Sequence, residues 1–446
     1  FPQICQQVEQ TSSKLRLTDG SNGCSLVARC ALRAGEVILT EKPFFEGNVQ
    51  AAHSQQVYCE DFLTKLGKVA GDGSNAPEDF QEDCLHPRSP LMDCVAAILL
   101  CKQQLGEASG DALLKLQKIC ALFQSPVQST TDHKECVDDL WGALKPELRQ
   151  ITSQDELGYI LQILSGNRFG QGKHSMHLLF AGSMFQHSCL PNCFLGTWNT
   201  SDEVQTYRAL RDIAEGEALT IDYLNMPQGY CPVSARTQAF QKWGFTCSCP
   251  RCVELPEVER SFNCDACGEP DLCPRFPGSV ELQCLSCQAV AGASYAAKCF
   301  RKELELQPEP GSPASDTFRK MEESEADEEN LLSHRHHLVV QALWEDVEQG
   351  LPDSAELPAF LRILEVLIES ISSICRCKEH PALLQLYHLA ALSTQEDLEA
   401  QKHFLQLEYG ILQRFYPDEA ERQEEEIEPL VKCASQPTEA GHAHLN

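Results

Sequence analysis

The sequence predicts an α+β fold in which short strands in small sheets are combined with helices. Residues 15–45 and 176–223 alternate apolar and polar side chains in short runs bounded by turn-forming residues, a pattern typical of half-buried strands. Residues 331–417 instead repeat their apolar side chains at helical spacing, which predicts a helical region. Between these regions, residues 243–299 are rich in cysteines with the spacing of metal ligands. We therefore expect strands, a metal-stabilised segment and an all-α C-terminal domain.

The strands follow from local alternation. In the first strand segment, residues 26–28 and 37–39 are apolar runs, and the glycine-containing stretch 33–36 separates them as a turn. This arrangement predicts two or three short strands. In the second segment, residues 205–210 and 218–223 are the strand candidates, because they alternate and carry β-branched or aromatic side chains.

The helices follow from a different spacing. Residues 91–123 and 133–165 carry apolar side chains three and four positions apart, so a helical insertion is expected between the two strand segments. Near the C-terminus, residues 357–368 form one apolar face, and further helices are expected at 383–392 and 398–415. Together these predict stacked antiparallel helices.

Six segments result from these patterns. We expect N-terminal strands over 1–50, a helical insertion over 51–150, a strand core over 151–225, a metal-binding region over 226–300, an acidic linker over 301–330 and a helical domain over 331–446. Residues 321–330 contain six acidic side chains and little to bury, so we expect this part of the linker to be mobile.

The formal net charge of the 446 residues is −29. This charge opposes direct binding to a phosphate backbone and would attract a basic protein partner, although it could serve solubility alone. The longest apolar run, residues 91–101, contains Asp93 and is too short to span a bilayer. Residues 1–10 lack the basic start and apolar stretch of a signal peptide. We therefore expect no membrane association, and we expect a monomer.

The 24 cysteines could indicate disulfides, but their spacing favours metal binding. Seven of those between Cys247 and Cys287 fall into Cys-x-Cys or Cys-x-x-Cys patterns, which are typical of metal ligands. Cys94, Cys101 and Cys120 lie on apolar stretches and are expected to be buried thiols. The protein is therefore expected in a reducing compartment, the cytoplasm or the nucleus.

A first zinc site is predicted by three closely spaced cysteines. Cys247, Cys249 and Cys252 lie within six residues and need one more soft ligand to complete a tetrahedral zinc site. Cys189, in the segment His-Ser-Cys-Leu-Pro-Asn, is the natural candidate for that ligand. The alternative is that all of these cysteines are buried thiols.

A second zinc site is predicted by two Cys-x-x-Cys knuckles separated by sixteen residues. The four cysteines fit a zinc ribbon, and Cys273, which lies between the knuckles, could compete as a ligand. A structural role is favoured over a recognition surface. The predicted ligands of this second zinc are Cys264, Cys267, Cys284 and Cys287.

Three further residues have ordinary interpretations when each is taken alone. Asn167 stands where a helical pattern ends and could simply terminate that helix. His187 alone would be a satisfied core histidine, and Tyr223 a buried aromatic of a strand. None of the three alone predicts an enzyme.

Taken together and in order, these residues resemble the SET domain of protein-lysine methyltransferases, in the branch called SET-and-MYND proteins. The strongest part is the segment 217–224, Glu-Ala-Leu-Thr-Ile-Asp-Tyr-Leu, with the His-Ser-Cys segment upstream and Arg236, Trp243, Phe245 and the cysteine triplet downstream. The resemblance covers roughly residues 15–50 and 150–295 and, more weakly, the helical C-terminus.

The resemblance implies a SET-domain fold of small curved sheets, a cysteine-rich post-SET zinc region and a tetratricopeptide-like C-terminal domain. It implies S-adenosyl-L-methionine as methyl donor and Cys189 as fourth ligand of the first zinc. The implied activity is protein-lysine N-methyl transfer to a histone or non-histone lysine, with a basic segment of the substrate suited to the acidic chain. The alternative is a non-catalytic SET-like scaffold that binds a basic protein partner.

Individual roles follow from the same resemblance. Tyr223 matches the catalytic tyrosine, and Trp243 a residue that lines the lysine channel beside it. The positions that match donor-binding residues are Gly23, Cys24 and Ser25 in a glycine turn, Asn167, the pair Gln186 and His187, and the adenine-stacking Phe245.

This chain departs from the family pattern in three places. Ser25 replaces the second glycine of the donor-binding turn, so a side chain stands where the backbone is expected to approach the donor. Gln186 replaces an asparagine and is one methylene longer. Residues 50–90 lack the cysteine ladder of a MYND zinc module, so the chain resembles a MYND-less member of the branch.

Overall fold

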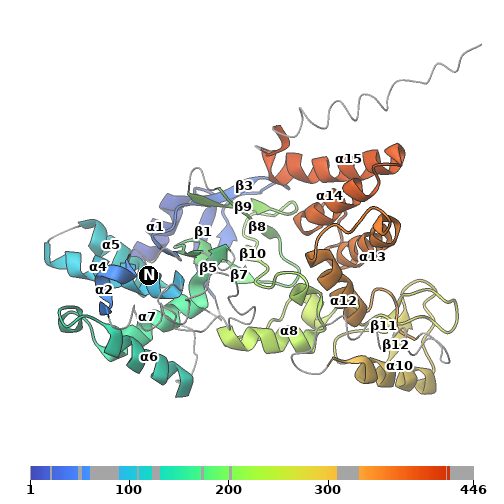
Figure 1. The fold of residues 1–446 in the computed structure, drawn as a ribbon, viewed down its shortest axis with the longest axis horizontal. Helices are drawn as coiled ribbons and strands as arrows, with labels where there is room; N and C mark the ends of the chain where they lie inside the picture. Colours follow the sequence, from blue (N-terminus) through green and yellow to red (C-terminus); the bar gives the residue numbers. More distant parts are fainter. Residues whose placement is uncertain are drawn as a thin grey trace, which may run out of the picture. The chain divides into compact units, whose positions relative to one another are not determined.

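The structure is a computed structural model, and it divides into two compact units (Figure 1). The first unit contains Phe1–Gln186, Leu195–Ile221 and Ala239–Thr246, and the second contains His187–Phe194, Asp222–Gln238 and Cys247–Asn446. The residues that the structure describes are 2–20, 23–48, 53–60, 90–107, 110–122, 131–171, 175–199, 203–308, 331–417 and 419–421. Most of the segment predicted to lack a MYND module, most of the acidic linker and the C-terminal tail lie outside these residues.

Short strands dominate the first unit and pair in several small sheets. Strand β1 pairs with β2, β3 with β9 and β9 with β8, while β6 pairs with both β4 and β5. The strands are β1 (Leu15–Gly20), β2 (Gly23–Ala28), β3 (Val37–Glu41), β4 (Phe45–Asn48), β5 (Arg168–Gln171), β6 (Ser175–Leu178), β8 (Cys193–Asn199), β9 (Val204–Ala209) and β10 (Thr220–Ile221), the last paired with β7 (Gln186–His187).

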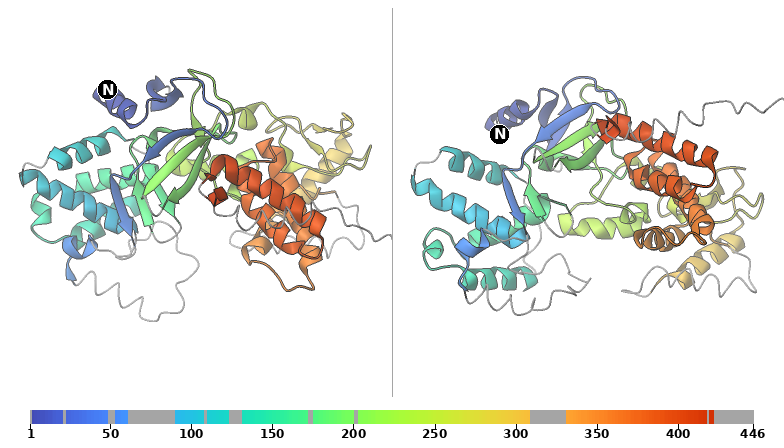
Figure 2. Two further views of the ribbon diagram at one scale, coloured as in Figure 1. Left: turned by 90° about the horizontal axis from the view of Figure 1, so that it is seen from above. Right: turned by 45° about the horizontal axis from the view of Figure 1, so that its top comes forward.

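Helices gather beside these strands in the first unit (Figure 2). Helix α4 packs on strand β4, and the contact is close because Gly47 of β4 has no room for a Cβ: one built there would lie 2.0 Å from the Pro90 carbonyl oxygen. The helices are α1 (Pro2–Thr11), α2 (Ser54–Val57), α4 (Pro90–Gln103), α5 (Gly110–Ala121), α6 (Thr131–Ala143) and α7 (Gln154–Asn167), with short 3-10 helices η1 (Gln104–Glu107), η2 (Leu148–Gln150), η3 (Gly182–Met184) and η5 (Gln241–Trp243).

A buried carboxylate organises the turn that leads to the Gln186–His187 pair. Glu41, at the end of β3, is 8% exposed. Its oxygens accept hydrogen bonds from the backbone N–H groups of Phe180, Ala181 and Gly182 at 2.9, 3.0 and 2.8 Å. Burial raises the pKa of Glu41, against these hydrogen bonds, which favour the charged form. The carboxylate of Glu41 thus accepts hydrogen bonds from three consecutive backbone N–H groups of this turn. Buried N–H groups outside a strand or helix need such a partner.

The second unit carries the cysteine-rich segment and the C-terminal helices. Helices α12, α13, α14 and α15 pack on one another in chain order (Figure 1). The elements are η4 (Gln228–Tyr230), α9 (Pro250–Val253), η6 (Val258–Arg260), β11 (Leu272–Pro274), β12 (Leu282–Cys284), α10 (Ala293–Leu306), α12 (His337–Glu348), α13 (Leu357–Cys375), η7 (Pro381–Leu383), α14 (Leu384–Ser393) and α15 (Leu398–Phe415). Helix α8 (Val233–Phe240) and the strands β7 and β8 each contain residues of both units.

Much of the predicted secondary structure is confirmed, with three corrections. The strands at 26–28, 37–39 and 205–210 and the helix at 398–415 are present. The strand expected at 218–223 is reduced to β10, because only part of this stretch finds a partner. Helices α1 and α10 were not expected. Cys94 and Cys101 are buried as predicted, but Cys120 is exposed, because it lies on the outer side of amphipathic α5. Among the described residues, no helix is both long and apolar enough to cross a membrane.

Candidate functional site

The four cysteines of the predicted first zinc site meet in the second unit. The Sγ atoms of Cys189, Cys247, Cys249 and Cys252 all lie within 4.8 Å of one another. Cys189 Sγ is 3.5 Å from Cys252 Sγ and 3.9 Å from Cys247 Sγ. A zinc–sulfur bond of about 2.3 Å gives a tetrahedron with edges of about 3.8 Å. The donor set and its spacing therefore fit a zinc ion.

Local turns present these thiols. The hydroxyl of Ser188 accepts a hydrogen bond from the Leu190 N–H at 3.1 Å, which turns the chain at Cys189. The Cys252 N–H donates to the Cys249 carbonyl at 2.8 Å, and Pro250 between them starts the one-turn helix α9. Hydrogen bonds from the Cys189 thiol lower the pKa of Cys247 and of Cys249, so the thiolate form that binds metal is favoured there.

Two buried arginines surround this cluster. The Arg236 guanidinium lies 3.6 Å from Cys252 Sγ, and Arg251 donates to the Cys189 carbonyl at 3.3 Å and to the Gly229 carbonyl at 2.8 Å. Both arginines pair with the buried carboxylate of Glu259. Their positive charge stabilises nearby thiolates, and their hydrogen bonds hold the backbone that carries the ligands.

His187 connects the cysteine cluster to Tyr223. Its Nδ1 accepts a hydrogen bond from the Tyr223 N–H at 3.0 Å, so the proton of the neutral ring is on Nε2. That nitrogen lies 3.2 Å from Cys189 Sγ and can donate to it. The Asp222 carboxylate is 3.6 Å from Nδ1, and the rings of His187 and Tyr223 are 5.2 Å apart. One imidazole thus contacts a thiol of the four-cysteine cluster and accepts a hydrogen bond from the backbone of Tyr223.

Tyr223 is held in its neutral form. Burial raises the pKa of its hydroxyl well above the ordinary value. At neutral pH the group is therefore a phenol that can both donate and accept a hydrogen bond. This is the state in which it could orient an amine without acting as an anion.

The first unit contains most of the predicted donor-binding residues. Gly23, Cys24 and Ser25 form the start of β2, which also bridges to the 217–224 motif through Val27 and Ala218. The Ser25 hydroxyl forms a hydrogen bond with the hydroxyl of Thr18 on the paired strand β1, with the two oxygens 3.1 Å apart. The Ser25 hydroxyl is therefore engaged with a neighbouring strand.

Asn167 and Gln186 also lie in the first unit. Asn167 is the last residue of α7 and is 4% exposed. Its side-chain amide donates to the Ile163 carbonyl at 2.8 Å, which accords with a helix-terminating role. Gln186 is half-buried and directly precedes His187 in strand β7.

An aromatic cluster contains the two predicted wall residues. The Phe245 ring stacks on Phe240 with centroids 5.0 Å apart and planes at 24°, and the Trp243 ring is 6.3 Å from Phe240. Gly244 makes the tight turn between the two wall residues with φ 70°, a value that favours glycine. Phe240 is fully buried and holds the other two rings, so it is a site residue that the sequence did not single out.

The four cysteines of the predicted zinc ribbon also meet. Sγ separations of 3.8 Å join Cys264 to Cys287 and Cys267 to Cys284, and all four ligand atoms lie within 4.8 Å of one another. Strands β11 and β12 pair between the knuckles. Cys273 is not part of the cluster: its thiol is turned toward the Gln283 carbonyl, 4.0 Å away.

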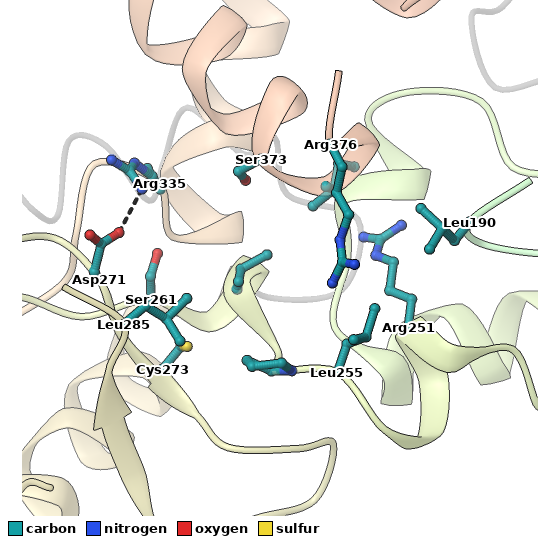
Figure 3. A pocket seen from close by; sticks show the side chains of 13 residues that line it. Leu190, Arg251, Leu255, Ser261, Asp271, Cys273, Leu285, Arg335, Ser373 and Arg376 are labelled. Carbon is teal, nitrogen blue, oxygen red and sulfur yellow. Dashed lines mark hydrogen bonds and ion pairs between the residues drawn. The ribbon is translucent and has the colours of Figure 1, made fainter. Parts of the chain in front are cut away.

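A cavity of about 360 Å³ in the second unit is lined by Leu190 and Arg251, which adjoin Cys189 and Cys252 in the chain, and by residues of the ribbon, of the segment after Cys252 and of helix α13 (Figure 3). Arg251 and Arg376 face it, and Arg335 is tied to Asp271 at 2.6 Å. No predicted donor-binding or catalytic residue is among its lining residues. It is therefore a feature separate from the predicted methyl-transfer residues.

Sequence reasoning missed the polar shell of the first cluster. Arg251, between the last two cysteines of the triplet, donates to the Cys189 carbonyl, and Glu259 pairs with that arginine. The signal available in the sequence was the presence of charged residues beside the cysteine triplet. Charged residues are common throughout the chain and usually lie on the surface, so this signal is weak. Arg236 was part of the resemblance, but its contact with Cys252 follows only from the structure.

Comparison with known proteins agrees with these features. The family model described as SET domain matches residues 23–224. The chain is similar to a SET and MYND domain-containing protein of Dictyostelium discoideum, 38% identical over 74 residues, 16% of this chain and 17% of that protein. It is also similar to the histone-lysine N-methyltransferase ASHR2 of Arabidopsis thaliana, 25% identical over 280 residues, 52% of this chain and 70% of that protein.

The likenesses beyond the domain are distant and partial. Three curated relatives are matched over only 17% to 28% of their own length. A solved structure of Rubisco LSMT bound to AdoMet aligns with 90% of this chain and 93% of that chain, at 12% identity and a TM-score of 0.33, which is too weak to carry an argument. The match over residues 23–224 nevertheless includes the His187–Tyr223 pair and the Cys189 segment. Residues 23–224 match a SET domain, and through that region the chain is similar to proteins named as histone-lysine N-methyltransferases.

Proposed function

We propose that this protein is an S-adenosyl-L-methionine-dependent protein-lysine N-methyltransferase that acts on a histone or non-histone lysine. The observation that carries the proposal is the contact chain from Cys189 through His187 to the backbone of Tyr223. A tyrosine at the end of the SET match is held by a histidine that also touches a four-cysteine cluster. Such support is what a positioned catalytic hydroxyl requires.

The roles are assigned residue by residue. Tyr223 is the catalytic residue, and a substrate-channel role is assigned to Trp243 and to Tyr223. Zinc ions are assigned to the two four-cysteine clusters. Donor binding is assigned to Gly23, Cys24, Ser25, Asn167, Gln186, His187 and Phe245.

The substrate amine must lose its proton before it can react. A lysine with a pKa of about 10.4 is only about 0.1% neutral near pH 7.4, a deficit of roughly 4 kcal/mol. Desolvation in an apolar channel lowers the lysine pKa, so no dedicated protein base is required. Bound S-adenosylmethionine supplies an electrophilic methyl group next to a positive sulfonium. The neutral Tyr223 hydroxyl would orient the amine through a hydrogen bond, and Trp243 would exclude water.

The fit to the donor depends on Phe245 and Ser25. The Phe245 ring is already stacked on Phe240, and its half-buried position leaves part of the ring available to a purine. The Ser25 hydroxyl is engaged with Thr18, which favours a donor that meets the backbone of β2 beside it. Replacing Ser25 with glycine is expected to preserve or strengthen donor binding.

Partner choice is proposed from charge and from the C-terminal helices. A net charge of −29 favours a lysine within a basic segment of the substrate. Helices α12 to α15, which pack successively, are proposed to be a tetratricopeptide-like domain that covers the substrate. We propose that the protein acts as a monomer in the cytoplasm or nucleus.

The Tyr223→Phe substitution tests the proposal. Wild-type protein, a peptide array and isotope-labelled donor are incubated, and methylated lysines are identified by mass spectrometry. Tyr223→Phe is expected to keep the fold and donor affinity and to lower turnover about tenfold or more, because one positioned hydroxyl is lost. Tyr295→Phe, which removes a tyrosine hydroxyl on helix α10 that donates to the Asn263 carbonyl, is the control. Equal turnover in the Tyr223→Phe and wild-type proteins would remove Tyr223 from the mechanism.

A non-catalytic scaffold is the second candidate, favoured by the departures at Ser25 and Gln186. Calorimetry with S-adenosylmethionine separates the two. Micromolar binding supports the enzyme, and no heat at millimolar donor supports the scaffold.

A further inference from the structure

Three buried side chains outside both cysteine clusters converge in the second unit. Glu303 lies near the end of helix α10, His336 is the N-cap of α12 and His337 is the first residue of α12. Their ligand atoms all lie within 4.8 Å of one another. The side chains are 6%, 0% and 7% exposed, in that order. A carboxylate and two imidazoles are thus enclosed together, beside the core that the ribbon shares with α10 and α12.

These three side chains lie close together but do not form good hydrogen bonds with one another. His336 Nε2 is 3.4 Å and His337 Nε2 is 3.5 Å from the same Glu303 oxygen, beyond the range of a good N–H···O hydrogen bond. Among the described residues, His336 Nε2 and both ring nitrogens of His337 have no hydrogen-bond partner. Buried imidazole nitrogens without hydrogen-bond partners lower the stability of the folded protein. A bound ligand that these nitrogens contact would remove that cost.

The separations match the edges of a metal tetrahedron. Zinc bound to nitrogen or oxygen at about 2.0–2.1 Å gives edges of about 3.3–3.4 Å. The two Nε2–Oε1 distances, 3.4 and 3.5 Å, are close to this value. The two cysteine clusters of the same unit show the corresponding agreement for sulfur, with separations of 3.5 to 3.9 Å.

The charges at the site suit a cation. Glu303 forms an ion pair with Arg260. Arg260 donates to both Glu303 oxygens at 2.8 and 2.5 Å and also faces the buried Glu257 carboxylate at 3.4 Å. The arginine charge is therefore shared between two carboxylates.

One local bond must change for His336 to bind through Nε2. Its Nδ1 now accepts a long hydrogen bond, 3.3 Å, from the Leu338 N–H. Metal binding at Nε2 puts the ring proton on Nδ1, so this contact is given up. A single hydrogen bond at the long limit is worth much less than a ligand bond to a structural zinc. His337 requires no such exchange, because neither of its ring nitrogens is engaged.

We propose that Glu303, His336 and His337 form a third metal site, which takes a zinc ion and joins helix α10 to the start of α12. Imidazole and carboxylate donors suit zinc. With three protein ligands, the fourth position is taken by water. The site ties the ribbon's helix to the first C-terminal helix across a long stretch of chain, and it does not depend on methyl-transfer activity.

Metal content of the full-length protein tests the site. After exhaustive dialysis, zinc is measured by inductively coupled plasma mass spectrometry in the wild type, His337→Gln and His334→Gln. The control residue His334 is exposed and contacts Glu369 instead. His337→Gln is expected to contain one zinc fewer per chain than wild type, and His334→Gln the same number. Equal zinc in wild type and His337→Gln would overturn the proposal.

X-ray absorption at the zinc edge provides a test that needs no variant. The eight thiolates of the two cysteine clusters contribute only sulfur neighbours. A third site adds nitrogen and oxygen neighbours near 2.0–2.1 Å, so about a third of the first shell should be light atoms. A pure sulfur shell in the wild-type protein would reject the site even if His337→Gln does not fold.

Discussion

The two four-cysteine clusters have the same donor set but differ in what surrounds them. The first joins Cys189 to a knuckle far along the chain, and two of its ligands, Cys189 and Cys252, are 5% and 7% exposed. Its neighbours are charged side chains and a histidine. In the second cluster all ligands lie between Cys264 and Cys287, and Cys267 and Cys287 are exposed. Backbone N–H groups and the strand pair β11–β12 shape this ribbon.

This difference predicts how far damage spreads from each cluster. Loss of the first should release Arg236, Arg251 and His187 together, and His187 also contacts Tyr223. Buried arginines that lose a charged neighbour are costly, so the effect should reach the proposed catalytic residue. Loss of the second should remain within the ribbon and the small core that it shares with α10. The substitutions below test this contrast from the largest expected effect to the smallest.

The largest effect is expected for Cys189→Ser. Removal of the ligand that joins the two segments should eliminate one zinc and reduce methyl transfer by about 100-fold or more, since even residues one shell further from a metal are worth 10–100-fold. Zinc content and turnover are measured in the same preparation. Cys193→Ser, a buried thiol outside the cluster, is the control. A variant that loses zinc and keeps full turnover would show that the cluster does not support Tyr223.

A smaller effect is expected for His187→Leu. The substitution keeps a side chain of similar size but leaves the Tyr223 N–H without its acceptor, at a cost of about 1–3 kcal/mol. Turnover should fall about tenfold while zinc content stays unchanged. Thermal unfolding and zinc analysis separate this positioning effect from loss of the metal. Were the variant to lose zinc as well, His187 would act mainly through Cys189.

The smallest effect on turnover is expected for Cys267→Ser. The ribbon should lose its zinc and unfold locally, while methyl transfer stays within about twofold of wild type, because the ribbon cysteines pack with one another and with the small core shared with α10. Amide hydrogen exchange should show the loss of protection in β11 and β12. A fall in turnover as large as that of Cys189→Ser would contradict the difference between the clusters.

Local spacing predicted the elements that depend on local geometry. A Cys-x-x-Cys knuckle is a turn whose ligands are a few residues apart, so Cys264, Cys267, Cys284 and Cys287 could be assigned from the chain alone. Helix α15 was predicted with its bounds because its apolar period and its N-cap Asp397 are both local signals. The pairing of Cys189 with the distant triplet rested partly on the resemblance.

Residues that act through distant partners could not be predicted in the same way. Phe240 has its role because α8 is followed by a turn at Gly244 that returns Phe245 to it. Glu259 is buried only because two arginines meet it there. Cys120 was predicted to be buried because its sequence neighbours are apolar, but its side chain is exposed. Helical period predicts which side chains share a face but not which face meets a neighbour.

By itself the amino-acid sequence predicted the α+β class, the four cysteines of the ribbon and the Cys247, Cys249 and Cys252 triplet, because each rests on residue type and short spacing. Cys189 as the fourth cysteine and Tyr223 as the candidate catalytic residue rested on the resemblance to SET domains. Only the tertiary structure decided that His187 connects a thiol to Tyr223, that Cys273 is turned away from the ribbon's ligands, and that Glu303 meets two histidines. The physical reason is that hydrogen bonds and ligand contacts act over about 3–4 Å. Which distant side chains come that close depends on how the whole chain is folded.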